Sequence, residues 1–217
     1  MKLYGYWRSS AAWRVRIALG LKGIDWETVP VHLVRDGGEQ RRPEHLRLNP
    51  QGLVPVLVCD GMTFTQSLAI IEYLDESRPG PPLLPGDPAG RARVRSLAQL
   101  IACEIHPLNN LRVLQYLEQR LEQDEARRTG WYQHWVGEGL RALEMRLAGE
   151  PGTGRFCHGD VPGLADCCLV PQLYNARRYG CELDSFPTLL AVEAACMELD
   201  AFCRAAAEAQ PDAVPGA

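Results

Sequence analysis

Hydrophobic and polar positions along the first third of the chain switch between a strand-like and a helical spacing. Residues 2–6 indicate a short β-strand, and residues 26–33 alternate as a second strand does. Between them apolar side chains recur at helical spacing over residues 11–19. Ser9 favours the start of that helix, because a serine hydroxyl at the N-cap accepts a hydrogen bond from a first-turn amide. Pro30 cannot donate to a sheet ladder, so we expect the second strand at an edge of the sheet.

The pattern then predicts a hairpin followed by a helix. Residues 56–59 and 62–65 are strand-like and flank Asp60-Gly61, which is a strong signal for a two-residue turn. A short helix over 44–48 precedes the hairpin, and helical spacing predicts a further helix over 68–78. The order strand, helix, strand, helix, hairpin, helix joins a parallel crossover to an antiparallel edge, and it resembles a thioredoxin-like α/β domain.

Two stretches rich in proline and glycine, 79–82 and 85–88, interrupt regular structure, and we place a domain boundary there. Beyond them the pattern is helical, and it predicts helices over 89–123, 125–147 and 164–179 and a last one with Pro187 in its first turn. The prediction is therefore a thioredoxin-like α/β domain over residues 1–80, an all-α domain over 88–210 and a flexible tail over 211–217.

The composition excludes several classes of protein. Of the 217 residues, 46% are hydrophobic and 23% are charged, as in an ordinary globular chain with a buried core. No apolar run reaches the length of a membrane helix, and a net charge of −4 gives no electrostatic reason to expect nucleic acid. The eight cysteines contain no Cys-x-x-Cys pair, so we expect reduced thiols in a cytoplasmic protein, without metal or disulfides.

Two polar pairs, Ser9-Ser10 and Gln66-Ser67, stand where a predicted strand meets a predicted helix. The free amides of a helix N-terminus carry partial positive charge and bind anions. Taken singly, each serine is typical of a helix cap, and Ser67 is the expected N-cap of the helix over 68–78. Taken together, the two pairs predict a site that holds a small acidic peptide at several points.

Val54-Pro55, immediately before the hairpin, adds a third element to this site. An X-Pro bond is trans by default. A cis bond would instead turn the Val54 backbone outward and offer its amide and carbonyl to a peptide-like ligand in the manner of a β-strand. The sequence leaves this choice open.

These motifs carry a resemblance that covers nearly the whole chain. They are Ser-Ser-Ala-Ala-Trp-Arg-Val-Arg-Ile-Ala-Leu at 9–19, Asp36-Gly37-Gly38 with Gln40, Asn49-Pro50-Gln51, Leu53-Val54-Pro55, Gln-Ser-Leu-Ala-Ile-Ile-Glu-Tyr-Leu at 66–74, Leu83-Leu84-Pro85, Ile-His-Pro-Leu-Asn-Asn at 105–110 and Leu164-Ala165-Asp166. The chain resembles the cytosolic glutathione transferases, and specifically their zeta class, the maleylacetoacetate and maleylpyruvate isomerases. The first motif is close to diagnostic of that class.

The resemblance implies glutathione as the cofactor and assigns its contacts. Ser9, helped by Ser10, is the expected catalytic group, because it donates to the glutathione sulfur in such enzymes. The implied cofactor-binding residues are Ser9, Ser10, Ala11, Gln40, Val54, Pro55, Gln66, Ser67, His106 and Asn110. Arg8, Arg112 and Arg178 are the implied contacts for the carboxylates of a dicarboxylate substrate. Because 21 of the 23 basic residues are arginine, any single arginine is weak support for anion recognition.

The implied reaction is the cis–trans isomerisation of a short diketo dicarboxylic acid in aromatic degradation. A glutathione thiolate adds to the cis double bond, rotation follows, and expulsion of the sulfur leaves the trans isomer and regenerates glutathione. The sequence does not distinguish maleylacetoacetate from maleylpyruvate as the substrate, since no residue measures the length of the acid beyond its ketone.

Two other functions stay open. A conjugating transferase acting on α-halo acids or other electrophiles would use the same thiolate but release a stable thioether. A non-catalytic interaction module with a transferase fold would not need an intact peptide site, so Ser9, Gln66 and Ser67 argue against it. We also expect a homodimer, because transferases of this fold pair the first domain of one subunit with the helices of the other.

The chain departs from the family pattern at two positions. Ala11 stands where eukaryotic members usually carry cysteine, although bacterial maleylpyruvate isomerases also lack that cysteine. Gly163 stands where a serine or threonine usually opens the capping box that ends at Asp166, so one side-chain hydrogen bond of the cap is lost.

Overall fold

The computed structural model describes residues 1–214 and divides the chain into two compact units. The first unit comprises Met1–Leu83 and the segment that begins at Met197, and the second unit comprises Leu84–Cys196. The division between Leu83 and Leu84 lies between the two stretches rich in proline and glycine, 79–82 and 85–88. The end of the chain differs from the prediction, because the segment beginning at Met197 belongs to the first unit and not to the helical one. Of the predicted tail over 211–217, residues 215–217 lie outside the described residues.

The first unit is built on a four-stranded sheet in the order β2-β1-β3-β4. Its strands are β1 (Lys2–Gly5), β2 (Glu27–Pro30), β3 (Val56–Cys59) and β4 (Met62–Thr65). β1 pairs with β2 in parallel, while β1 with β3 and β3 with β4 are antiparallel. The hairpin lies where the sequence predicts it, and β2 is an edge strand as Pro30 indicates. β2 is shorter than the predicted strand over 26–33.

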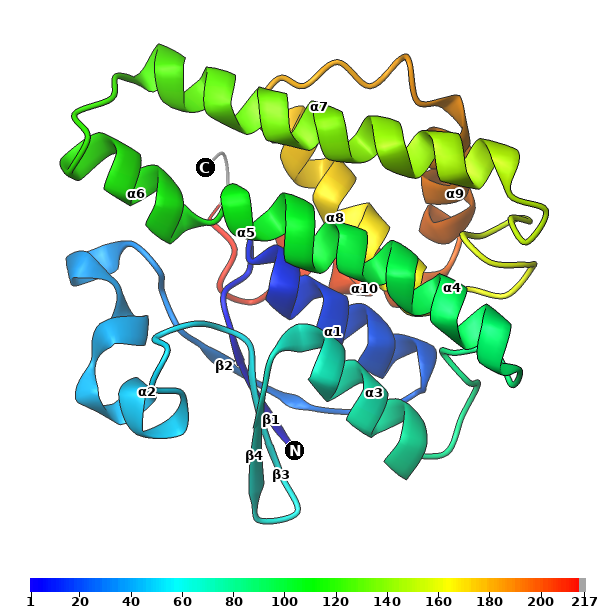
Figure 1. Ribbon diagram of the computed structural model, residues 1–217. Helices are drawn as coiled ribbons and strands as arrows, with labels where there is room; N and C mark the ends of the chain where they lie inside the picture. Colours follow the sequence, from blue (N-terminus) through cyan, green and yellow to red (C-terminus); the bar gives the residue numbers. More distant parts are fainter. Residues whose placement is uncertain (215–217) are drawn as a thin grey trace. The chain divides into compact units, whose positions relative to one another are not determined.

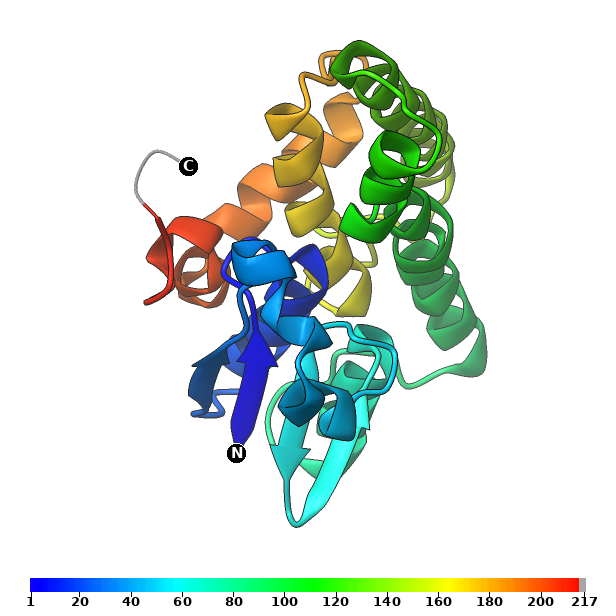
Figure 2. The same ribbon diagram turned by 90° about the vertical axis from the view of Figure 1, so that its left-hand side faces the viewer.

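Helices cover both sides of this sheet, with α1 and α3 on one side and α2 on the other (Figure 1). α1 packs against α3 and, on its other flank, against α10, the red helix beside it in Figure 2. This enclosure explains why residues 12–19 of α1 are all buried, two arginines included. The helices of the unit are α1 (Ser10–Leu21), α2 (Pro43–Leu48), α3 (Ser67–Ser77) and α10 (Asp200–Ala205), with single 3₁₀ turns at Arg35–Gly37, Glu39–Arg41 and Ala207–Ala209.

The second unit is helical, as predicted. Its elements are α4 (Pro88–Gln99), a π-helical segment η3 (Leu100–Ile105), α5 (His106–Leu108), α6 (Leu111–Gln119), α7 (Glu125–Gly149), α8 (Leu164–Arg178) and α9 (Pro187–Met197). The single helix predicted over 89–123 is wrong, because the chain leaves helical geometry at Asn109 and Asn110. Asn110 adopts an extended conformation and its side chain caps α6, so a new helix starts there.

α8 is the most enclosed helix of the second unit, with residues 164–173 all buried. Its N-cap is Gly163, and the buried Asp166 carboxylate accepts hydrogen bonds from the Gly163 amide at 2.8 Å and the Cys157 amide at 2.8 Å. Burial raises the pKa of the Asp166 carboxyl, against the lowering effect of these amide donors. The cap therefore has the Asp166 hydrogen bond of a capping box but lacks the one that a serine or threonine side chain at position 163 would add, as the sequence predicts.

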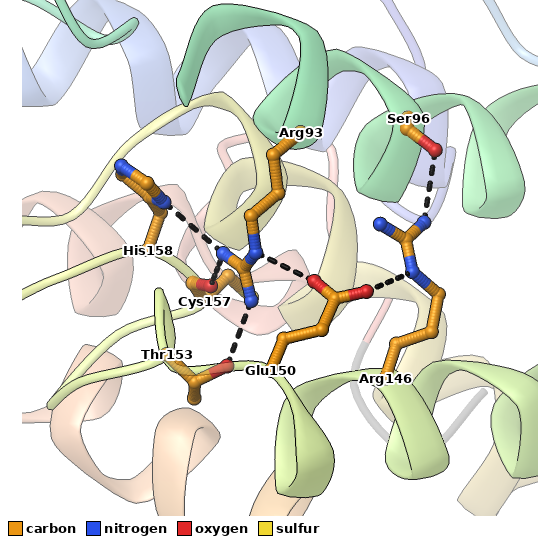
Figure 3. Close-up of polar contacts among 7 residues, drawn as sticks. All are labelled: Arg93, Ser96, Arg146, Glu150, Thr153, Cys157 and His158. Atoms are coloured by element: carbon orange, nitrogen blue, oxygen red, sulfur yellow. Dashed lines mark hydrogen bonds and ion pairs between the residues drawn. The ribbon is translucent and has the colours of Figure 1, made fainter. Parts of the chain in front are cut away.

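A polar cluster around Arg93 fastens the loop before α8 to α4 and α7 (Figure 3). The Arg93 guanidinium donates to the Glu150 carboxylate at 2.6 Å, and it also contacts the Cys157 carbonyl, the His158 ring and the Thr153 hydroxyl. Arg146 donates to the same carboxylate at 2.7 Å and to the Ser96 hydroxyl at 2.8 Å. Glu150 thus joins two guanidinium groups from two helices, and Arg93 holds the loop that presents the Cys157 amide to Asp166.

All eight cysteines are free thiols. Within residues 1–214, no three histidine, cysteine, aspartate or glutamate side chains are grouped so as to hold a metal ion. None of the helices over that same range is long and apolar enough to cross a membrane.

Glu150→Gln should lower the melting temperature at neutral pH. Its hydrogen bond to Arg146, followed by that to Arg93, lowers the pKa of Glu150 below its ordinary value of 4.5. The stabilisation is therefore complete above that ordinary value and is lost as the pH falls through the lower, folded-state pKa. We expect a loss of about 1 kcal/mol, or about 2–4 °C, because the pairs are partly exposed. Thermal unfolding followed by circular dichroism at neutral and acidic pH measures it.

Glu138→Gln is the matched control, because Glu138 pairs with Arg141 on the exposed face of α7. It should change the melting temperature by less than Glu150→Gln does at neutral pH. The cluster would have no stabilising role if the two variants melted alike, or if the effect of Glu150→Gln grew on acidification.

Candidate active site

Ser9 ends the turn after β1 and is the N-cap of α1. Its backbone is extended, and its hydroxyl oxygen accepts a hydrogen bond from the Ala12 amide at 3.3 Å. Because an amide already uses this oxygen as an acceptor, the hydroxyl proton is left to be donated elsewhere. Ser9 is partly exposed, so a hydroxyl donor faces solvent at the positive end of a helix dipole.

The neighbours of Ser9 differ in exposure. Ser10 is the first residue of α1 and is only 2% exposed, whereas Ala11 is partly exposed. Arg8 is partly exposed, and its guanidinium lies 4.7 Å from the centre of the Trp7 ring, a cation–π contact that restrains it. Of the two predicted catalytic serines, Ser9 is therefore the one whose side chain a ligand can reach.

The N-terminus of α3 forms a second polar corner. The N-cap is Gln66, with φ +68°, and not Ser67 as predicted. Ser67 is the first helical residue, and its hydroxyl accepts a hydrogen bond from the Arg14 guanidinium at 3.3 Å. As at Ser9, this leaves the hydroxyl proton for donation. The Gln66 side chain donates to the Gln51 side chain at 2.8 Å, which fixes its amide.

Arg14 is a part of this corner that the sequence does not reveal. It lies on the apolar side of α1 and is 1% exposed, beside the free amides of the α3 N-terminus. A buried guanidinium next to a helix N-terminus adds positive potential to that of the helix dipole. In a chain so rich in arginine, no pattern separates this residue from the surface arginines.

Side-chain hydrogen bonds to one carbonyl group hold the segment before the hairpin. The Val54–Pro55 peptide bond is cis, which answers the question left open by the sequence. The preceding Leu53 carbonyl accepts hydrogen bonds from the His45 ring at 2.9 Å and from the Asn49 side chain at 2.9 Å. Val54 itself is partly exposed, and it follows the carbonyl that these two side chains hold.

Gln40 lies in a buried position that suits a peptide ligand. Its side-chain amide donates to the Leu33 carbonyl at 3.2 Å, and its side-chain oxygen is buried without a hydrogen-bond partner among the described residues. A buried acceptor without a partner is unusual, and a peptide N–H group would satisfy it if the side chain turned toward the ligand. Gly38 allows the arrangement, because at φ +99° a Cβ there would lie 2.5 Å from the Gln40 side chain.

The remaining predicted residues belong to the second unit. The His106 ring lies 3.4 Å from the Asn110 side-chain nitrogen, and the Asn110 oxygen accepts from the Arg112 amide at 3.1 Å. These three residues therefore lie together at the junction of α5 and α6. Arg178 is on the last turn of α8, with its guanidinium 5.1 Å from the centre of the Tyr179 ring. Arg112 and Arg178 are both exposed.

Comparison with known proteins gives the chain a family. Residues 8–77 match the family described as the N-terminal domain of glutathione S-transferase. A maleylacetoacetate isomerase from Pseudomonas aeruginosa is 52% identical over 213 residues, which cover 98% of this chain and 98% of that protein.

Solved structures agree with this match. A bacterial maleylpyruvate isomerase, described as a zeta-class glutathione S-transferase in its holo form, superposes with a TM-score of 0.95 at 49% identity, covering 99% of this chain and 100% of that one. A maleylacetoacetate isomerase from Methylobacterium extorquens, with bound malonate and glutathione, gives a TM-score of 0.95 at 46% identity with the same coverage. The chain therefore belongs to the glutathione S-transferase family, in its zeta class together with the maleylacetoacetate and maleylpyruvate isomerases.

Proposed function

We propose that this protein is a glutathione-dependent cis–trans isomerase that converts maleylacetoacetate or maleylpyruvate to the fumaryl isomer. The observation that carries the proposal is Ser9, whose hydroxyl accepts from the Ala12 amide and so keeps its proton for a thiolate at the α1 N-terminus. The names of the relatives and the glutathione bound in one of them support the same reaction.

Glutathione, when bound, supplies the thiolate that adds reversibly to the double bond of the substrate. An ordinary thiol has a pKa of about 8.5 and is only a few per cent thiolate at neutral pH. Lowering that pKa by two units needs about 2.7 kcal/mol. A hydrogen bond to a charged sulfur contributes about 1.5–3 kcal/mol and a helix N-terminus about 0.3–1 kcal/mol. The contributions of Ser9 and the α1 N-terminus are therefore large enough to lower the thiol pKa by two units. A cysteine at position 11 is not needed, because the reacting sulfur belongs to glutathione.

The other polar groups of the first unit are suited to the peptide part of glutathione. Ser67 and Gln66 would hold the γ-glutamyl carboxylate at the N-terminus of α3, with Arg14 beneath them as a fixed positive charge. The buried Gln40 oxygen would accept from a peptide N–H, and the Val54 backbone would pair with the cysteinyl part.

The substrate needs cations of its own, because it carries two carboxylates and develops enolate charge during addition. We assign this role to Arg8, Arg112 and Arg178, whose guanidinium groups are exposed or partly exposed. The resemblance also assigns glutathione contacts to His106 and Asn110, whose side chains lie 3.4 Å apart at the junction of α5 and α6.

Product analysis tests the function directly. With glutathione and a cis diketo diacid, nuclear magnetic resonance should show the trans isomer accumulating while the glutathione concentration stays constant. Consumption of glutathione in step with substrate, giving a thioether, would make the protein a conjugating transferase instead. A protein that neither binds glutathione nor changes the substrate would be an interaction module.

Ser9→Ala should lower kcat by about 10²–10³-fold, as expected for one lost donor to a developing anion. The affinity for glutathione should change far less, because the lost bond is to the sulfur and matters most once the sulfur is charged. Steady-state kinetics with glutathione and substrate varied in turn separates the two effects. Equal losses in affinity and turnover would reduce Ser9 to an anchor, and an unchanged rate would remove it from the mechanism.

Ser67→Ala should act in the opposite way and weaken glutathione binding by about 10-fold or more, because a hydrogen bond to a carboxylate is lost. Turnover at saturating glutathione should stay near that of the natural protein. Titration calorimetry measures the affinity, and Ser77→Ala, at the exposed end of the same helix, is the control. Equal glutathione affinity in the two variants would contradict the assignment of Ser67.

We also propose that the protein is a cytoplasmic homodimer. The proposal rests on its family, in which the first domain of one subunit pairs with the helices of another. Light scattering at micromolar protein concentration should give twice the mass of the chain, and a monomer would contradict the proposal.

A further inference from the structure

The turn between β1 and Ser9 is held by one side chain from α1 and by another from the C-terminal segment. The Trp7 amide donates to the Asp212 carboxylate at 3.0 Å, and the Trp7 carbonyl accepts from the Arg16 guanidinium at 2.8 Å. Both backbone polar groups of Trp7 are therefore fixed, two residues before Ser9. The resemblance to known enzymes gives no role to Asp212, which lies in the stretch that the sequence predicts to be a flexible tail.

Arg16 joins the turn to the C-terminal segment. It is 3% exposed, and its guanidinium donates to the Ala205 carbonyl at 3.1 Å as well as to the Tyr6 carbonyl at 3.5 Å. Burial lowers the pKa of Arg16 to about 10, and the nearby charge of Asp212 opposes that shift. The guanidinium thus stays charged at neutral pH, with a carboxylate close to it and three carbonyl groups as acceptors.

Packing and hydrogen bonds hold the C-terminal segment itself in place. α10 packs along α1, and Gly20 allows close approach, because a Cβ there would lie 3.1 Å from that of Ala201. After α10, the Gln210 side chain donates to two carbonyl groups of the preceding turn at 2.9 Å each. The Ala213 amide then donates to the Gln210 carbonyl at 3.0 Å, which closes a turn around Asp212.

We propose that Asp212 is a positioning residue for Ser9. Asp212 holds the Trp7 amide while Arg16 holds the Trp7 carbonyl, and together they fix the position of the Ser9 hydroxyl. This inference rests on the proposed function, in which the Ser9 hydroxyl stabilises the glutathione thiolate. Such a donor works only within a narrow range of positions, and a misplacement of about 1 Å can reduce a rate by about 10²-fold. The predicted tail is therefore part of the support of the active site.

The test compares Asp212→Ala and Asp212→Asn in the full-length protein. Asparagine keeps an oxygen that can accept from the Trp7 amide, whereas alanine removes it. Asp212→Ala should lower kcat about 10-fold with little change in the KM for glutathione, and Asp212→Asn should restore most of the rate. Asp200→Ala removes an exposed carboxylate of the same C-terminal segment and is the matched control, which should behave like the natural protein.

Amide hydrogen exchange, measured without glutathione, gives the second readout. The peptide that contains Trp7 should exchange at least several-fold faster in Asp212→Ala than in the control, and Asp212→Asn should return it to slow exchange. Unchanged exchange in Asp212→Ala would overturn the inference, and so would faster exchange with an unchanged kcat. Because this readout needs no ligand, failure of the proposed function would appear separately, as normal turnover in Ser9→Ala.

Discussion

Two guanidinium groups buried on one helix hold the first unit's site together. Arg14 and Arg16 both lie on α1, which runs between α3 and α10. Arg14 donates to the Ser67 hydroxyl on α3, and Arg16 donates to the turn before Ser9 and to the end of α10. Three carbonyl groups replace the water that the buried Arg16 guanidinium loses, so its contacts restrict how α10 and the turn before Ser9 sit on α1.

The same hydrogen-bonding arrangement occurs at both corners of the candidate site, the one at Ser9 and the one at Ser67. At each, a serine oxygen accepts from the protein itself, the Ala12 amide at Ser9 and the Arg14 guanidinium at Ser67. Accepting these bonds does not use the hydroxyl proton, so each serine can still donate a hydrogen bond to an anionic ligand. Helix N-termini at both places add to that preference. Under the proposed function, the corner at Ser9 would hold the thiolate of glutathione and the corner at Ser67 one of its carboxylates.

Much of the fold follows from local pattern, and the exceptions have local as well as tertiary causes. The hairpin around Asp60-Gly61 and the helix capped by Ser9 are set by turn and capping chemistry within a few residues, so the sequence predicts both. The role of Arg14 depends on a contact with a distant helix, which no periodicity records. The break at Asn110 follows from a local side-chain cap, and the cap at Gln66 from a positive φ angle, and helical spacing alone reveals neither. The site residues are predicted only by the resemblance to a family, since a serine before a helix is usually only a cap.

The C-terminal segment is the largest difference from the prediction, and its reason is physical. Its small and polar residues are typical of a mobile end, yet Asp212 accepts from a backbone amide that lies far away in sequence.

The most direct test of how Ser9 and α1 act is the ultraviolet absorbance of the glutathione thiolate, titrated while bound to the natural protein. The bound thiol should ionise at least one pH unit below the value of about 8.5 that is ordinary for thiols. A bound thiol that titrates like free glutathione would contradict this mechanism.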